Sequence, residues 1–176
     1  MKISALIIIL GVLFDQLTKY LAKAFLAGTT ESVIWIPYLL ELGYYENRGA
    51  SLGILQDAQF LFMIITVIAL AIFGYMLLDT DFKQKKVYSI AVPLFIAGTL
   101  GNAIDRALLG YVIDFLHYPF LTPILNAVNL SNFYNNLADM YLSLAIVLFA
   151  VDLFILEPKR SKKEKKDADT AHSDQN

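Results

Sequence analysis

Residues 58–78 read AQFLFMIITVIALAIFGYMLL and contain no charged side chain. At 1.5 Å per residue, this run makes roughly 30 Å of helix, which is the thickness of the hydrocarbon core of a bilayer. Hydrophobic residues make up 57% of the 176 residues, well above the usual share in a soluble domain. The sequence therefore predicts a membrane protein, and its length predicts one domain.

Three further apolar runs are long enough to cross a bilayer. They cover residues 3–27, 87–106 and 136–157. We therefore predict an all-α membrane protein with four transmembrane helices, in which residues 1–158 form a single domain. We expect residues 3–27 to be a retained helix and not a cleaved signal peptide, because Asp15 follows the apolar core directly and no small-residue cleavage site comes after it.

The segments between and after these helices differ in character. Residues 32–37 and 40–45 are rich in β-branched and aromatic residues, which predicts a small β-rich region within the outer loop 28–57. Residues 107–135 are predicted as a second outer loop. Residues 159–176 are charged and lack apolar periodicity, which predicts a disordered tail.

Lysine and arginine gather at one end of the predicted helices. Ten of the 14 basic residues precede the first helix, join the second to the third, or follow the fourth: Lys2, Lys83, Lys85, Lys86, Lys159, Arg160, Lys162, Lys163, Lys165 and Lys166. The positive-inside rule then predicts that both termini are cytoplasmic and that the loops 28–57 and 107–135 face outward.

Composition excludes several classes of site. Cysteine is absent, which excludes disulfides and cysteine–metal sites, and only two histidines are present, with no HExxH pattern. We therefore expect no metal and no other cofactor. The net charge is −2 and no basic patch alternates with aromatic residues, so a nucleic-acid partner is not expected.

Three short polar runs, residues 98–106, 112–115 and 135–139, adjoin the ends of apolar segments. They contain Asp105, Asp114 and Asp139, and counting along the helices places all three carboxylates near the outer face. A carboxylate at the edge of hydrocarbon is costly and usually functional. Asp15 and Lys19, spaced i,i+4, lie on one helix face and form either an ion pair or part of a site.

Two close carboxylates share a proton, so that one activates water while the other polarises a carbonyl. Asp114 and Asp139 suit this role, whereas Asp105 beside Arg106 favours a salt bridge. Two other functions remain open. The carboxylates could relay protons in a small transporter. A serine–lysine protease could pair Lys19 or Lys23 with a serine. The candidate serines for that second function are Ser32 and Ser51.

Five motifs occur in order along residues 10–155: DQLTK at 15–19, ENRGA at 46–50, LGNAIDR at 100–106, VIDF at 112–115 and NLAD at 136–139. Together they resemble the motifs of the lipoprotein signal peptidase (signal peptidase II) family of bacterial four-helix aspartic proteases. The chain departs from the usual family residues at four places: Ser51-Leu52, Thr99, His117 and Asn135.

The resemblance implies that Asp114 and Asp139 are the catalytic dyad. It implies two further groups, one that supports the site or holds substrate and one that stabilises the fold. The first comprises Asn47, Asn102, Arg106 and Asn136, and the second comprises Asp15, Lys19 and Asp105. The implied substrate is a prolipoprotein with diacylglycerol on its lipobox cysteine, cleaved on the amino side of that cysteine. A monomer in the bacterial cell (inner) membrane, in contact with membrane lipids, is expected.

Overall fold

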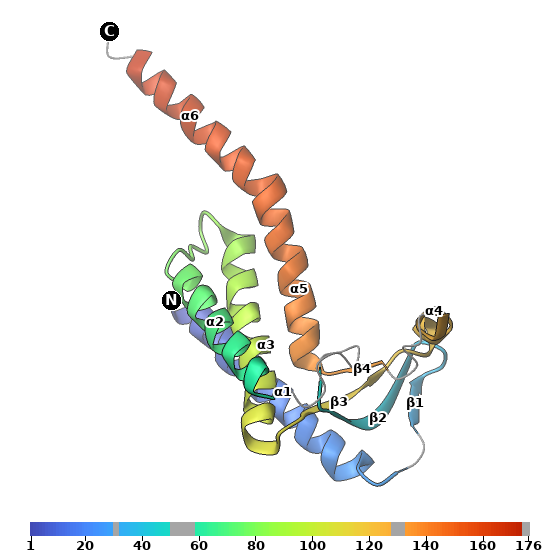
Figure 1. Ribbon diagram of the computed structural model, residues 1–176. Helices are drawn as coiled ribbons and strands as arrows, with labels where there is room; N and C mark the ends of the chain where they lie inside the picture. Colours follow the sequence, from blue (N-terminus) through green and yellow to red (C-terminus); the bar gives the residue numbers. More distant parts are fainter. Residues whose placement is uncertain (30–31, 50–58, 128–132, 174–176) are drawn as a thin grey trace.

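The computed structural model describes residues 1–29, 32–49, 59–127 and 133–173. Within these ranges four helical segments have the length and hydropathy of membrane spans: Lys2–Leu26, Gln59–Leu77, Lys86–Leu109 and Leu137–Lys163. Figure 1 shows them beside a small sheet, which lies at the end of the helices opposite the N-terminus. The prediction of a mainly helical protein with four candidate spans and a small β region is confirmed.

Helix α3 (Lys86–Leu109) is the centre of the helical part and packs against α1 (Lys2–Leu26), α2 (Gln59–Leu77) and α5 (Leu137–Val151). The Tyr88 hydroxyl near its start donates to the carbonyl of Met76, near the end of α2, at 3.0 Å. The Gln59 amide at the start of α2 donates to the carbonyl of Gly110, just after α3. Helices α2 and α3 are therefore antiparallel.

Two glycines allow α3 to approach its neighbours closely. A Cβ atom at Gly98 would lie 2.5 Å from the carbonyl oxygen of Ala138 on α5. A Cβ atom at Gly101 would lie 2.5 Å from a carboxylate oxygen of Asp15 on α1. Both contacts are too short for any larger residue, so the glycines bring the three helices together where their polar residues lie.

The sheet is antiparallel, with strand order β1–β2–β3–β4. Its strands are β1 (Val33–Ile36), β2 (Leu40–Asn47), β3 (Val112–His117) and β4 (Tyr134–Asn135). Apolar residues of β3 pack on the end of α1 in one buried cluster: Ala22, Leu26, Ile113, Phe115 and Leu116. This packing fixes the sheet against the helices, and it makes β3 a central strand although the sequence predicted only an outer loop there.

The remaining elements flank this core. A 3₁₀ turn (Pro119–Leu121) and the short helix α4 (Thr122–Ala127) follow β3, and a π-helical turn (Asp152–Leu156) joins α5 to α6 (Glu157–Ser173). Figure 1 shows α6 extending α5 away from the other helices. The sequence predicts a disordered tail from residue 159, whereas the structure describes helix as far as Ser173. In the first turn of α6, Arg160 contacts Glu157 and buried Asp152.

Candidate active site

Asp114 lies in the middle of β3 and is 1% exposed. Each of its carboxylate oxygens accepts a hydrogen bond from an asparagine amide. Asn47 on β2 donates to Oδ2 at 2.8 Å, and Asn136 donates to Oδ1 at 2.6 Å. The paired strands β2 and β3 bring Asn47 beside Asp114, because Asn47 pairs with Val112 in the antiparallel register.

Asp139 lies in the first turn of α5, where it forms a capping box with Asn136. Its backbone N–H donates to Asn136 Oδ1 at 3.0 Å, and its own Oδ2 accepts from the Asn136 backbone N–H at 3.3 Å. The other carboxylate oxygen, Oδ1, accepts from Asn102 Nδ2 of α3 at 2.8 Å. An N-terminal helix turn suits a carboxylate, since the unpaired N–H groups there favour negative charge.

Three asparagines are oriented so that their NH₂ groups face the two carboxylates. Asn47 Oδ1 accepts from the Gly49 backbone, and Asn136 Oδ1 accepts from the Asp139 backbone. Asn102 Oδ1 accepts from Lys19 Nζ at 3.0 Å and from Asn136 Nδ2 at 3.1 Å. Because each amide oxygen is held by a donor, each NH₂ group must point the other way. All four oxygens of Asp114 and Asp139 therefore receive a hydrogen bond from an uncharged group.

Both carboxylates line one cavity of about 250 Å³. Its wall is made by α2, α3, α5 and the ends of β2 and β3: Asn47, Phe62, Ile65, Thr66, Ala69, Thr99, Asn102, Arg106, Val112, Asp114, Asp139 and Leu142. The part of the chain that the structure describes holds no group of three His, Cys, Asp or Glu side chains placed to bind a metal ion. The cavity thus joins a polar end beside the sheet to an apolar end between helices.

Burial raises the pKa of the Asp114 carboxyl to about 7, and the nearby charge of Asp139 adds to the rise. The amide donors of Asn47 and Asn136 and the charge of Lys19 act in the opposite direction. A carboxyl group with a pKa near neutrality can hold a proton or release it at working pH, as general acid–base chemistry requires. Two carboxylates in one water-accessible cavity with a shared proton can activate water for attack on an amide.

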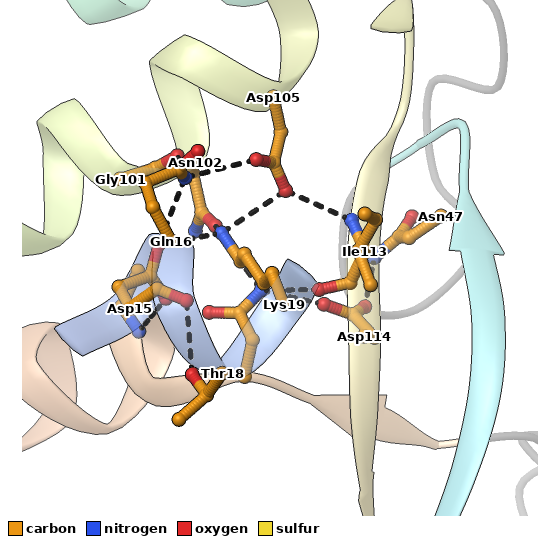
Figure 2. Close-up of polar contacts among 12 residues, drawn as sticks. Asp15, Gln16, Thr18, Lys19, Asn47, Gly101, Asn102, Asp105, Ile113 and Asp114 are labelled. Carbon is orange, nitrogen blue, oxygen red and sulfur yellow. Dashed lines mark hydrogen bonds and ion pairs between the residues drawn. The ribbon is translucent and has the colours of Figure 1, made fainter. Parts of the chain in front are cut away.

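A second group of carboxylates lies next to this pair, and Figure 2 shows its contacts. Lys19 is 1% exposed, and its ammonium group contacts Asp15 Oδ2 at 2.9 Å, Asp105 Oδ2 at 3.1 Å and Asn102 Oδ1 at 3.0 Å. Gln16 donates to Asp105 Oδ1 at 3.0 Å and to the carbonyl of Gly101 at 3.1 Å. We call Asp15, Lys19 and Asp105 the ion cluster.

The ion cluster also holds the backbone on both sides of the carboxylate pair. Asp15 Oδ1 accepts from the backbone N–H of Ala138, one residue before Asp139, at 2.9 Å. Asp105 Oδ2 accepts from the backbone N–H of Ile113, one residue before Asp114, at 3.0 Å. Each acid of the cluster therefore fixes the residue next to one member of the pair.

The predicted Asp15–Lys19 ion pair is present, but the predicted partner of Asp105 was wrong. Asp105 pairs with Lys19, whereas Arg106 lies in the cavity wall with its guanidinium carbon 4.5 Å from the centre of the Phe62 ring. Adjacent helical residues point about 100° apart, so Asp105 and Arg106 face different neighbours. The structure brings Asn47, Asn102 and Asn136 to the two carboxylates, and the sequence alone did not reveal that Asn136 contacts both.

The serine–lysine alternative can be compared with the structure in part. Ser32 donates to Glu41 Oε2 at 2.8 Å, and Lys19 is enclosed by acids and an amide oxygen. The Lys19 ammonium group therefore already has three hydrogen-bond or ion-pair partners, and no serine is among them. Ser51 lies outside the described residues.

Comparisons with known proteins agree with this arrangement. The sequence profile of the family described as signal peptidase (SPase) II matches residues 7–155. Lipoprotein signal peptidases of Streptococcus pneumoniae (strain ATCC BAA-255 / R6) and Staphylococcus aureus (strain bovine RF122 / ET3-1) are each 35% identical to this chain. The first alignment covers 85% of this chain and 90% of the relative, and the second covers 92% and 93%.

Two solved structures of bacterial membrane enzymes, obtained by the in meso method at 2.3 and 1.9 Å resolution, are each 33% identical to the chain. They superpose with TM-scores of 0.72 and 0.71, and each match covers 88% of this chain. The matches cover 88% and 94% of the two solved chains. The profile match and the curated relatives span most of the sequence, so the chain belongs to the signal peptidase II family.

Proposed function

We propose that the protein is a membrane aspartic endopeptidase in which Asp114 and Asp139 form the catalytic dyad. The observation that carries this proposal is that both carboxylates line one cavity and receive only uncharged hydrogen-bond donors. A carboxylate paired with a cation would stay ionised, whereas two unpaired carboxylates side by side retain one proton between them. The dyad can then supply both an acid and a base.

In the proposed reaction, water lies between the dyad and the scissile carbonyl. The ionised carboxylate takes a proton from the water as its oxygen attacks the carbonyl carbon. The protonated carboxyl donates a hydrogen bond to the carbonyl oxygen and stabilises the charge that develops there. Collapse of the tetrahedral intermediate breaks the C–N bond, and the leaving amine takes up a proton from the dyad. No metal or other cofactor takes part.

The proposed substrate is a prolipoprotein with diacylglycerol on its lipobox cysteine, cleaved on the amino side of that cysteine. Its signal peptide is apolar and membrane-bound, which suits a cavity lined by Phe62, Ile65, Ala69 and Leu142 beside the dyad. Arg106 is placed in the same wall near the sheet. We assign substrate binding or support of the dyad to Asn47, Asn102, Arg106 and Asn136, and support of the fold to the ion cluster.

The proposed orientation places both termini in the cytoplasm and the dyad near the outer face of the bacterial cell membrane. The lysines near the N-terminus, between α2 and α3, and on α6 support this orientation through the positive-inside rule. Figure 1 shows the sheet and the start of α5 at the opposite end of the helices, and these elements carry Asp114 and Asp139. Membrane lipids surround the four spans, and the protein acts as a monomer.

The transporter alternative fits less well. A proton relay needs titratable groups spaced across the bilayer. Asp15, Asp105, Asp114 and Asp139 are all joined to one hydrogen-bond network at one end of the helices. Helix α2 carries no ionisable group except Tyr75.

The test is cleavage of a purified diacylglyceryl-modified precursor by Asp114→Asn and Asp139→Asn. Each variant should lose at least about 10³-fold in kcat/KM, because the dyad loses either its base or its shared proton. Both should insert in the membrane and remain folded, as judged by circular dichroism and thermal unfolding in micelles. Glu46→Gln, which changes an exposed carboxylate on β2, is the matched control and should cleave normally. Cleavage at the wild-type rate by either dyad variant would refute the assignment.

A further inference from the structure

Two threonines line the cavity at the end that lies between the helices. Thr99 on α3 lies three residues before Asn102, and Thr66 on α2 lies four residues after Phe62, so each is about one helical turn farther from the sheet. Their neighbours in the wall are Ile65, Ala69 and Leu142. Both threonines are half-buried. Two hydroxyl groups therefore stand in an otherwise apolar part of the cavity.

Neither hydroxyl donates to or accepts from any group among the described residues. Other threonines of the chain do bond to their own backbone: Thr18 to Phe14 and Asp15, Thr29 to Leu26, and Thr80 to Leu77. Bonding to a preceding carbonyl is the usual way in which a helical threonine satisfies its hydroxyl. Away from water an unpaired hydroxyl costs about 1–3 kcal/mol, so these two groups are available to a ligand.

The proposed substrate needs such groups. A membrane-spanning peptide satisfies its backbone N–H and C=O groups by forming a helix, and its carbonyls are then already hydrogen-bonded along the chain. The dyad can polarise the scissile carbonyl only if that helix is unwound locally. Unwinding frees neighbouring backbone groups at membrane depth, where water is scarce and each unpaired group is costly. Side-chain hydroxyls of neighbouring helices are one of the means by which such freed groups are paired.

We propose that Thr66 and Thr99 form a backbone-binding subsite that pairs the freed amide groups of the substrate's signal peptide next to the scissile bond. The proposal rests on the proposed function and adds to it a way of holding the substrate unwound. The ligand is a peptide backbone in extended conformation, so the subsite recognises main-chain groups and not the identity of the side chains. Thr66 and Thr99 are positioning residues that contact the substrate away from the reacting atoms.

The first test removes each hydroxyl without changing side-chain size. Thr66→Val and Thr99→Val should each raise KM for a lipidated precursor by about three- to tenfold, with kcat nearly unchanged, since one neutral hydrogen bond is lost in both ground and transition states. The double variant should show about the product of the two effects. Thr66→Ser and Thr99→Ser keep the hydroxyl and should restore the wild-type KM. Thr80→Val removes a hydroxyl that lies outside the cavity and is the matched control.

A second test identifies the ligand group. A series of precursors carries one backbone ester in place of an amide, moved residue by residue through the signal peptide near the cleavage site. An ester lacks the N–H donor and its carbonyl is a weaker acceptor, so at one position the ester should raise KM for the wild type and have little effect on the Thr66→Val/Thr99→Val variant. This coupling in a double-mutant cycle would locate the bonded peptide group.

The outcomes separate this proposal from the proposed function. If the Thr66→Val/Thr99→Val variant has the wild-type KM while Asp114→Asn is inactive, the subsite is wrong and the protease assignment stands. If the serine variants are as impaired as the valine variants, the threonines act through packing, and the subsite is again wrong. A raised KM with serine rescue and unchanged thermal unfolding supports the subsite.

Discussion

The ion cluster and the proposed catalytic dyad both contain aspartates and lie in one hydrogen-bond network, yet their surroundings differ. Asp15 and Asp105 share the Lys19 ammonium group, and none of the three lines the cavity. Asp114 and Asp139 receive only amide donors and line the cavity wall. We infer that the ion cluster is structural, because its charges are paired and it does not line the cavity. The two carboxylates of the proposed dyad have no cation in contact and line the cavity, which suits a reactive site.

Asn102 and Asn136 connect the two regions and keep them distinct. Asn102 accepts a hydrogen bond from Lys19 through its oxygen and donates one to Asp139 through its NH₂ group. The Lys19 cation is therefore linked to the dyad through Asn102 and does not contact either carboxylate of the dyad directly. A lysine placed directly against the dyad would hold both carboxylates ionised and remove the shared proton. An asparagine between them therefore lets a buried cation and a proton-sharing pair coexist.

The strongest test of the difference between the ion cluster and the dyad is to remove the shared cation, Lys19. Lys19→Met should lower the free energy of unfolding by about 3–5 kcal/mol, because two buried carboxylates lose their partner. Denaturant titration in micelles, followed by circular dichroism, measures this loss. Asp139→Asn, by contrast, should cost only about 1 kcal/mol, since it removes one hydrogen-bond acceptor and leaves no buried cation unpaired.

Two further variants control this result. Arg48→Met breaks the exposed Arg48–Glu46 pair, whose side chains are 61% and 39% exposed, and should cost less than about 1 kcal/mol. The triple variant Asp15→Asn/Lys19→Met/Asp105→Asn removes all the charges and should recover part of the stability. A Lys19→Met protein as stable as the wild type would show that the cluster is not the structural site described above.

The second test is the pH dependence of stability. Burial and the charge of Asp139 raise the pKa of Asp114 from 3.8 to about 7. Between these values the folded protein holds more protons than the unfolded chain, so the free energy of unfolding should fall as pH rises from about 4 to about 7. The total change is at most about 4 kcal/mol.

Thermal unfolding at a series of pH values measures this slope. Asp114→Asn should flatten it over the same range, because the group that titrates is gone. Glu46→Gln, which changes an exposed carboxylate, should keep the wild-type slope. If wild-type stability rose with pH in this range, Asp114 would be stabilised by its ionised form and would belong with the ion cluster.

The smallest expected effect on stability is at Asn136, which serves both as helix cap and as donor to the dyad. Asn136→Ser keeps an oxygen that can cap α5 but loses the NH₂ group that binds Asp114 and Asn102. It should change stability by less than about 1 kcal/mol but lower kcat by about 10–100-fold with little change in KM. Asn136→Ala should lose both functions, with about 1 kcal/mol of stability lost as well. A wild-type kcat in Asn136→Ser, which keeps the cap but lacks the NH₂ group, would contradict a role beyond capping.

Much of the fold could be predicted because membrane spans are determined by local composition. The uncharged run 58–78 and the three other apolar runs predicted helices that the structure has within a few residues. The i,i+4 spacing of Asp15 and Lys19 left an ion pair as one of two alternatives, and the structure has that pair. The β-branched residues 32–37 predicted β1 for the same reason. In each case the signal and the structure involve residues close together in sequence.

The parts that could not be predicted depend on contacts between distant residues. Strand β3 is a strand because it pairs with β2, which is more than 60 residues away, and nothing in residues 112–117 alternates between apolar and polar. Asp105 pairs with Lys19 and not with its sequence neighbour Arg106 for a similar reason, since α1 and α3 must first pack through Gly101. The roles proposed for Asp114 and Asp139 rest on the family resemblance, whereas the contact of Asn136 with both required the tertiary structure.

The oriented asparagines have a consequence for inhibitor design. Every oxygen of Asp114 and Asp139 already accepts a hydrogen bond from the protein, and both residues line the cavity, so what they still offer a ligand is chiefly acceptor capacity. A compound that offers only carbonyl groups to this surface can use a single proton of the dyad. A compound with a hydroxyl or a protonated amine at that point brings its own donors and can bind both carboxylates at once. Potency against this protein should therefore depend on donor count at the warhead more than on apolar bulk.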